Sequence, residues 1–261
     1  MKKLKVTGAV IVFSVIFSVS AFSQINKVPN LKLYDFERLH FGFILVANEM
    51  DFMVKAKDDL YQTYWEDIPN DGDLKGSYAA RIYGIQANPS IGFSVGIVGD
   101  LRLGEYFNLR SIPTLAFGRR ELSYRMKLYD DDNQPILNDS ILSITKKINS
   151  TMVEFPFLLK YKSKRDHNMR AYVIGGVKFS FDLASQANKE EESNFDPKLF
   201  RTDTYGVVGA GLDFYMNWFK FGVELTMSYG FRDMLLREGN LYTDSIESLR
   251  SKIFMFTFTF E

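Results

Sequence analysis

Two segments of the chain alternate strictly between apolar and polar positions. Residues 219–229 read FKFGVELTMSY, and residues 253–260 read IFMFTFTF, with phenylalanine at every second position. A period of two residues is typical of a β-strand that has one apolar face. Because four phenylalanines share one face of the second segment, that face requires an apolar surface.

The same alternation can be laid on six further segments, so the sequence predicts eight β-strands. The predicted strands are residues 39–52, 91–103, 108–124, 151–162, 170–183, 205–218, 219–229 and 253–260. The connections alternate in length: residues 53–90, 126–150, 184–204 and 232–248 are long and polar, and residues 104–107, 163–169 and 217–218 are short. We therefore expect the long and the short connections at opposite ends of an antiparallel sheet.

This pattern predicts an all-β fold, an eight-stranded antiparallel transmembrane β-barrel with long extracellular loops and short periplasmic turns. The alternative is a soluble β-sandwich or lipocalin-like barrel, whose apolar faces point inward. Eight strands enclose a lumen that ordinary side chains already fill, so it has little room for the phenylalanine rows. The polar faces are also rich in glycine, as a crowded interior requires: Gly42, Gly92, Gly96, Gly176, Gly209, Gly211 and Gly222.

The first residues have the layout of a secretory signal peptide. Three lysines within residues 1–5 precede the apolar stretch 6–19, and small residues stand before Gln24. An uncleaved anchor helix is the alternative, but the apolar stretch is shorter than the roughly 20 residues that a spanning helix needs. We expect cleavage between Ser23 and Gln24, a periplasmic N-terminal segment at residues 24–38, and the barrel at residues 39–261.

Composition removes several classes of function. The 261 residues contain no cysteine, which excludes disulfides, thiolate metal sites and a cysteine nucleophile. Lys and Arg (32) balance Asp and Glu (32), so a basic nucleic-acid interface is not expected. The mean hydropathy of −0.13 is too polar for a bundle of membrane helices, although 24 residues are phenylalanine.

Strand parity also places the charged residues. A Lys or Arg on the lipid side at the membrane midplane would cost about 2–4 kcal/mol, so the charges opposite the apolar rows should face inward and pair. This predicted interior network comprises Arg110, Arg120, Glu154, Lys160, Lys178, Asp182, Asp213, Lys220 and Glu224. A lumen filled by ion pairs leaves no open channel. Pro113 and Pro156 lie inside predicted strands and remove ladder hydrogen bonds, so we expect β-bulges there.

Candidate motifs have simpler explanations. The glycines of residues 206–211 are followed by more strand pattern and not by a helix, so a dinucleotide loop is not expected. An EF-hand starting at Asp130 would place Pro135 where glycine is needed and Ile141 where the bidentate glutamate belongs, so residues 130–133 read as a solvated loop. The acidic run 190–192 reads as a solvated loop too. No metal or cofactor is expected.

An enzymatic role would need a nucleophile with a base in reach. Eight-stranded outer-membrane enzymes that acylate or deacylate lipids use a histidine at the outer leaflet. His40 and His167 are the only histidines, and both fall at the predicted periplasmic end. The sequence therefore predicts a protein that is not an enzyme and has no small-molecule substrate.

Five stretches of the chain carry a family resemblance. They are LHFGFILVANEMDF at 39–52, LRLGEYFNLRSIPTLAFGRR at 101–120, EFPFLLKYKSKR at 154–165, AYVIGGVKFSFDLASQ at 171–186, and SKIFMFTFTFE at 251–261. These stretches resemble the PorT family of outer-membrane proteins from the type IX secretion system of Bacteroidota. The family is expected to have a glycine near Val46, where this chain departs from it.

The resemblance implies an outer-membrane barrel that is needed for the export of cargo with C-terminal sorting domains. Its expected partners are outer-membrane lipid and other secretion-system proteins, and it cannot itself be the conduit, because eight strands enclose a filled lumen. The alternative is a structural or adhesin-type barrel that binds partners through its surface loops. Phe256, Phe258 and Phe260 form the expected signal for insertion by the barrel assembly machinery.

Overall fold

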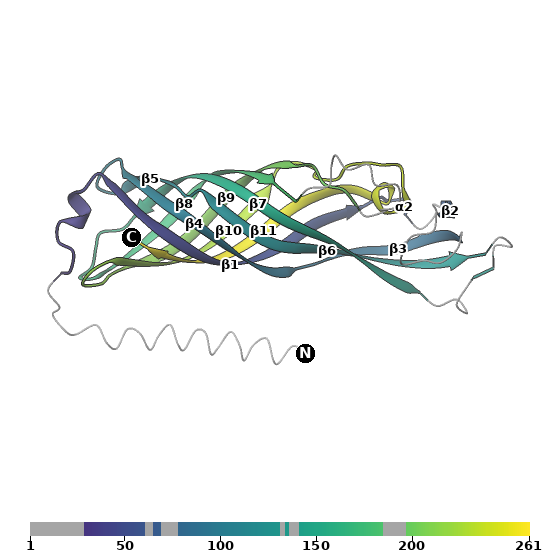
Figure 1. Ribbon diagram of the computed structural model, residues 1–261, viewed down its shortest axis with the longest axis horizontal. Coiled ribbons are helices and arrows are strands. Elements are labelled where there is room, and N and C mark those ends of the chain that lie inside the picture. The colour runs from purple at the N-terminus through teal and green to yellow at the C-terminus, as the bar shows by residue number, and fades with distance from the viewer. Residues whose placement is uncertain (1–28, 61–64, 69–77, 131–133, 136–140, 185–196) are drawn as a thin grey trace, which may run out of the picture.

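The structure is a computed structural model, and it describes residues 29–60, 65–68, 78–130, 134–135, 141–184 and 197–261 (Figure 1). The expected cleavage site at Ser23 and Gln24, and the acidic run 190–192, lie outside the described residues. No helix in the described part of the chain is long and apolar enough to span a membrane.

Antiparallel strands cross obliquely around a closed barrel (Figure 1). The strands are β1 (Leu39–Ala56), β2 (Trp65–Ile68), β3 (Tyr78–Asn88), β4 (Ser90–Arg102), β5 (Phe107–Ser111), β6 (Thr114–Tyr129), β7 (Leu142–Lys162), β8 (Met169–Asp182), β9 (Thr202–Tyr215), β10 (Lys220–Gly230) and β11 (Ile246–Phe260). Only Pro89 separates β3 from β4, and only Ile112 and Pro113 separate β5 from β6. Each of these pairs forms one continuous wall strand.

The barrel has eight wall strands, as predicted from the alternation. β1 closes the ring because it pairs with β11 on one side and with β4 on the other. The wall strand β5–β6 pairs with both β4 and β7. β2 is not part of the ring; among the described strands it pairs only with β3, alongside the part of β3 that extends away from the ring.

The prediction of β-bulges at the two prolines is wrong. Gly99 pairs with Ser111 and Gly96 pairs with Thr114, so the register is unchanged across Pro113. The β7–β8 register also runs through Pro156 without a shift. The β5–β7 and β6–β7 registers place Pro156 opposite Ile112, the residue before Pro113. The two prolines, neither of which has a backbone N–H to donate, therefore lie close together in the wall. A local break in the ladder therefore accommodates both prolines.

The outward rows form an apolar belt. Phe43, Phe93, Phe157, Phe219 and Leu225 are exposed on the outer wall, and the phenylalanine rows of β10 and β11 stack across strands. The inward rows hold the charged and small residues of the same strands, together with two buried apolar clusters. This segregation is the one that strand parity predicts.

The strands extend well beyond the belt at the end that carries the long connections, which we call the long-loop end. β3, β6 and β7 project furthest (Figure 1). The predicted loops 53–90 and 126–150 therefore contain strand, because β3 and the first part of β7 lie within them. The predicted loops 184–204 and 232–248 likewise contain the starts of β9 and β11 and a short helix, α2 (Leu241–Asp244). These segments are polar outside and apolar inside, so their composition resembles that of loops.

An apolar core fills the lumen at the long-loop end. Inward residues of the strands pack there against residues from the connections, including Tyr242 of α2. The Tyr124 hydroxyl donates to the backbone oxygen of Tyr242 at 3.2 Å, and the two rings meet edge to face. The buried members are Phe52, Leu60, Ala80, Ile82, Leu122, Tyr124, Met126, Leu128, Ile144, Leu199, Met234, Leu235, Leu241, Tyr242, Ile246 and Leu249.

The opposite end carries the short turns, and we call it the short-turn end. Residues 29–38, the strap, run across this end and include the one-turn 3-10 helix η2 (Tyr34–Phe36). The strap corresponds to the described part of the predicted segment 24–38. It brings polar side chains to the opening of the lumen.

Candidate functional site

The charged residues assigned to the interior from parity are all buried in the lumen. They are Arg110, Arg120, Glu154, Lys160, Lys178, Asp182, Asp213, Lys220 and Glu224. Each lies on an inward row of its strand and is linked to other inward side chains. The strands bring them together in two groups, one near the short-turn end and one at the middle of the barrel.

Arg110 of β5 is the centre of the first group. Its guanidinium donates to Asp100 at 3.1 Å, to Glu224 at 3.3 Å and to Glu261. Glu261 also pairs with Lys220, and Lys160 donates to Asp213 at 2.7 Å. Arg110 has no exposed surface, so its charge depends entirely on these carboxylates.

A tyrosine joins this group to the opposite wall. The Tyr172 hydroxyl donates to Glu224 at 2.8 Å, and the Lys160 ammonium lies 3.7 Å from the Tyr172 ring centroid. A Cβ added at Gly211 would lie 2.5 Å from the Tyr172 ring. Glycine at this position therefore makes room for the tyrosine. The glycines of residues 206–211 serve the barrel wall in β9, as the strand pattern predicted.

The second group lies towards the apolar core. Lys178 donates to Glu154 at 2.7 Å. Arg120 donates to Ser150 at 2.7 Å and to Ser251 at 3.0 Å, and it lies 3.6 Å from Asp182. Its guanidinium also lies 4.8 Å from the centroid of the Phe52 ring. Arg120 therefore marks the boundary between the charged and the apolar parts of the lumen.

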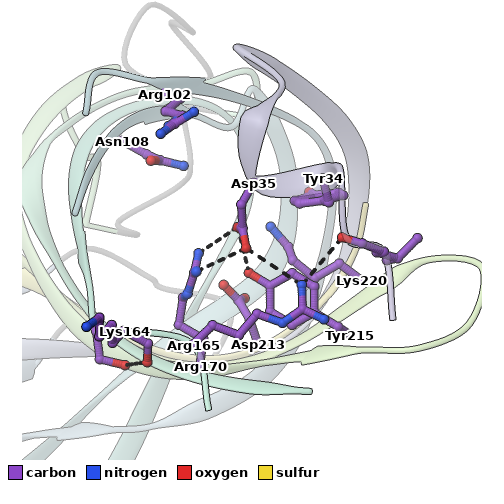
Figure 2. Close-up of polar contacts among 12 residues, drawn as sticks. Tyr34, Asp35, Arg102, Asn108, Lys164, Arg165, Arg170, Asp213, Tyr215 and Lys220 are labelled. Atoms are coloured by element: carbon purple, nitrogen blue, oxygen red, sulfur yellow. Dashed lines mark hydrogen bonds and ion pairs between the residues drawn. The ribbon is translucent and has the colours of Figure 1, made fainter. Parts of the chain in front are cut away.

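The opening of the lumen at the short-turn end forms a third polar group, which we call the mouth. Inward or turn residues of the barrel surround it in Figure 2: Arg102, Asn108, Arg165, Arg170 and Tyr215. Lys162, the buried last residue of β7, lies on the same inward face. Figure 2 shows Asp35 of the strap reaching into this ring. Arg170 binds the Asp35 carboxylate through both terminal nitrogens, at 2.8 and 3.1 Å. The Tyr215 hydroxyl donates to the same carboxylate at 3.2 Å, and Arg165 lies 3.6 Å away.

The environment of Asp35 favours its charged form. Partial burial opposes ionisation, but the Arg170 charge and the hydrogen bonds from Arg170 and Tyr215 outweigh it, and they lower the pKa of Asp35 below its usual value of 3.8. Its neighbour Tyr34 donates from its hydroxyl to Glu261 at 2.7 Å, so burial and this carboxylate raise the pKa of Tyr34. The strap thus connects the mouth with the Arg110 group.

The histidines lie at the short-turn end. His40 Nε2 donates to the backbone oxygen of Tyr34 at 2.8 Å, and its ring stacks on the Tyr34 ring with centroids 3.9 Å apart. His167 Nδ1 lies 2.6 Å from Asp166 in an exposed turn. Among the described residues, neither ring contacts a serine or threonine hydroxyl, and no three metal-ligating side chains cluster. Asp130 is exposed in the connection after β6.

Four further charged residues face the lumen by the same strand parity, although the predicted network did not include them. Asp100, Lys162 and Arg170 lie on the inward rows of β4, β7 and β8, and Glu261 continues the inward row of β11. Asp35 and Tyr34 had no such signal, because the strap has no strand periodicity. Phe256, Phe258 and Phe260 face the belt, where Phe260 stacks on Phe43 with centroids 4.9 Å apart.

The space left inside the barrel is small. An internal cavity of about 30 Å³ lies between the charged groups, lined by residues that include Glu154, Lys178 and Glu224. A cavity of that size accommodates about one or two water molecules. The described lumen therefore contains no wide aqueous passage at this level.

Comparison with known families agrees with this geometry. Residues 70–236 match the family described as outer membrane protein beta-barrel domain, which is more than half of the chain. The chain belongs to this family. As an outer-membrane barrel it lies in the cell outer membrane, and because such barrels have short periplasmic turns, the short-turn end faces the periplasm.

Solved structures similar to this family member are also outer-membrane proteins. OprG from Pseudomonas aeruginosa is 13% identical, with 84% of this chain and 94% of that chain covered and a TM-score of 0.35. The outer membrane protease OmpT from Escherichia coli is 11% identical, with 86% and 96% covered and a TM-score of 0.38. The N-terminal barrel domain of Pseudomonas aeruginosa OprF is 13% identical, with 83% and 98% covered and a TM-score of 0.26. No curated protein matches the chain.

Proposed function

We propose that this outer-membrane barrel is a non-enzymatic component of the type IX protein secretion system, needed for export of cargo with C-terminal sorting domains. The resemblance of five stretches to the PorT family, including LRLGEYFNLR and FPFLLKYKSKR, supports this role. Its partners would be outer-membrane lipid and other proteins of the secretion system.

The observation that carries the proposal is the filled lumen. Ion pairs and two smaller apolar clusters occupy the short-turn half, and the large apolar core occupies the long-loop half. The internal cavity between the two charged groups measures about 30 Å³. A folded or extended polypeptide cannot pass through such a lumen. The barrel would therefore act beside the conduit, as an accessory or assembly factor, and its surfaces would provide the function.

The decisive experiment compares the secreted proteins of cells with and without this chain. We expect cargo with C-terminal sorting domains to remain inside the cell envelope after deletion, and to be exported again when the wild-type chain is restored. A secreted profile that deletion leaves unchanged would refute the role. Purified barrel in planar bilayers should show no stable conductance, because the lumen is filled; a steady open channel would contradict the non-conduit role.

The projecting strands favour one alternative, a surface-binding or adhesin-type barrel. β3, β6 and β7 extend beyond the belt and present polar side chains such as Arg125 and Lys147 on their outer faces. Met126 lies opposite Leu142 in the β6–β7 register, so replacing residues 127–141 by an Asn-Gly turn would shorten this projection and leave the belt intact. A secretion component should still export cargo after this change, whereas an adhesin should lose cell-surface attachment.

A further inference from the structure

The Asp35 carboxylate occupies an anion-binding site built by the barrel. Three groups converge on it: the two terminal nitrogens of Arg170 in β8, the Tyr215 hydroxyl at the end of β9, and the Arg165 guanidinium in the turn between β7 and β8. The Arg165 guanidinium lies 3.7 Å from the centroid of the Tyr215 ring, which holds it over the opening. Paired guanidinium contacts of this kind recognise the geometry of a carboxylate.

The mouth carries more positive charge than Asp35 balances. Lys162 is only 5% exposed, yet it has no ion pair among the residues that the structure describes. In the β7–β8 register Lys162 lies opposite Tyr172, and Arg170 is the neighbouring inward residue of β8. Arg102 lies across the mouth (Figure 2), and within the described part of the chain its side chain has one hydrogen bond, to the backbone oxygen of Gly104 at 3.2 Å, and no ion pair. These two side chains leave positive charge at the mouth that a second carboxylate could neutralise.

The strap that supplies Asp35 is held mainly by polar contacts, and its one aromatic anchor is the half-buried Tyr34 ring, which stacks on His40. None of the η2 residues is buried, and the side chains of Leu33 and Phe36 are 74% and 73% exposed. Leu31 has φ of 47°, a conformation that residues other than glycine rarely adopt. Arg165 binds the backbone oxygen of Asn30, and Asn30 contacts Asn168 and Tyr215. Such a segment can leave the mouth without exposing a core.

We propose that the mouth is a binding site for an acidic peptide segment of a periplasmic partner protein, and that Asp35 of the strap is its built-in competitor. In the free barrel the strap fills the site. A partner that offers carboxylates next to an aromatic residue reproduces the Tyr34-Asp35 pair and gains the unpaired Lys162 as well. Binding of the partner releases the strap, whose exposed Leu33 and Phe36 then become available as a second contact.

The proposal of a peptide-binding site rests only on the geometry of the mouth and on the family assignment, and not on the proposed secretion role. If the peptide did not bind, the proposed secretion role would be unaffected. If the secretion role were refuted, peptide binding could still be tested with purified protein.

The test uses the full-length barrel in detergent and a fluorescent peptide with the strap's own sequence, LKLYDFE. The tethered strap competes at a high effective concentration, so wild-type protein should bind the peptide weakly. Asp35→Asn removes the competing carboxylate and should raise the peptide affinity by roughly tenfold or more. The matched peptide LKLYNFE should bind neither protein. Equal affinities of the wild type and Asp35→Asn for LKLYDFE would overturn the proposal.

A second substitution locates the peptide. In the Asp35→Asn background, Arg170→Gln should abolish the gained affinity, because it removes the paired nitrogens. Lys164→Gln is the matched control, since it removes an exposed positive charge from the short turn after β7 that makes no contact with Asp35. Loss of affinity in both variants alike would show that only net charge matters, and this would contradict a defined site.

The wild-type carboxylate can be tested without removing it. The chain has no cysteine, so Leu33→Cys introduces a single thiol for an environment-sensitive dye on the strap. Excess LKLYDFE should shift the dye emission as the strap leaves the mouth, and LKLYNFE should not. An emission that neither peptide changes would overturn the competition, even if Asp35→Asn failed to fold.

Discussion

The two halves of the lumen are filled by different chemistry. In the short-turn half, Arg110 pairs with three carboxylates, and Lys160 and Lys220 each pair with a carboxylate of another wall strand or its end. In the long-loop half, side chains such as Leu122, Tyr124 and Tyr242 form an apolar core of the kind found in soluble proteins. One wall strand, β5–β6, contributes to both, with Arg110 at one end and Leu122 at the other.

The difference follows from what lies outside the wall. At the level of the belt the outer face is apolar, so the inward face takes the charges. Beyond the belt the outer face meets water, and the inward face can be apolar as in an ordinary amphipathic sheet. The short-turn half should therefore determine the stability of the barrel. The long-loop half should determine how firmly the segments beyond the belt are held in place.

Removing Arg110 should have the largest effect. Arg110→Met leaves Asp100, Glu224 and Glu261 without their shared cation, and breaking a buried pair costs about 3–5 kcal/mol. We expect a much lower unfolding temperature in detergent gels, where a folded barrel runs differently from a heated one. Arg125→Met, an exposed residue of β6, is the control and should leave unfolding unchanged. Equal stability of both variants would mean that the network does not support the barrel.

Leu122→Ala tests the other half. Leu122 is fully buried in the apolar core, and such a truncation costs about 2–5 kcal/mol locally. Because the core lies beyond the belt, we expect faster proteolysis within residues 232–245 and little change in the heat-modifiable mobility of the ring. Leu115→Ala, on the lipid-facing side of the same strand, should change neither. Loss of the ring together with the core would show that the halves are coupled.

Acid should release the strap before it affects the apolar half. The pKa of Asp35 is lowered in the folded protein, so its carboxylate stabilises docking above the usual value of 3.8 and stops doing so as the pH falls through the lowered pKa. The dye on Leu33→Cys should therefore report release only at strongly acidic pH. In the Asp35→Asn variant this acid transition should disappear; a transition that persists there must come from another group.

The smallest effect is expected for the histidines. The double substitution His40→Ala, His167→Ala removes the stacking on Tyr34 and an exposed pair with Asp166. Neither ring contacts a nucleophile in the described structure, so we expect normal secretion at normal barrel levels. Secretion that is lost while the folded barrel persists would indicate an active site at the periplasmic end.

The sequence predicted the ring because lipid and lumen impose a strict period of two. It also placed Arg110 and Glu224 in the lumen, since each shares the parity of its strand. The same rule applies to Asp100 and Glu261. The projection of β6 and β7 was mistaken for loops because polar outer residues such as Arg125 and Lys127 resemble a loop in composition. The contact of Asp35 with Arg170 joins residues 135 positions apart and left no local pattern.

The unbroken register at Pro113 limits how the gene can change length. Ser111 and Thr114 are three positions apart in the chain, and their partners Gly99 and Gly96 on β4 are also three positions apart, so no residue is inserted at Pro113. Arg110 and Arg120 therefore point to the same face of the wall strand. Inserting or deleting one codon between them would turn one arginine toward the hydrocarbon, whereas a change of two codons would keep both in the lumen. In related genes, length differences within the wall strands should therefore come in even numbers, and odd ones should fall in the connections or be absorbed by a register shift such as that between Ile82 and Gly84 in β3.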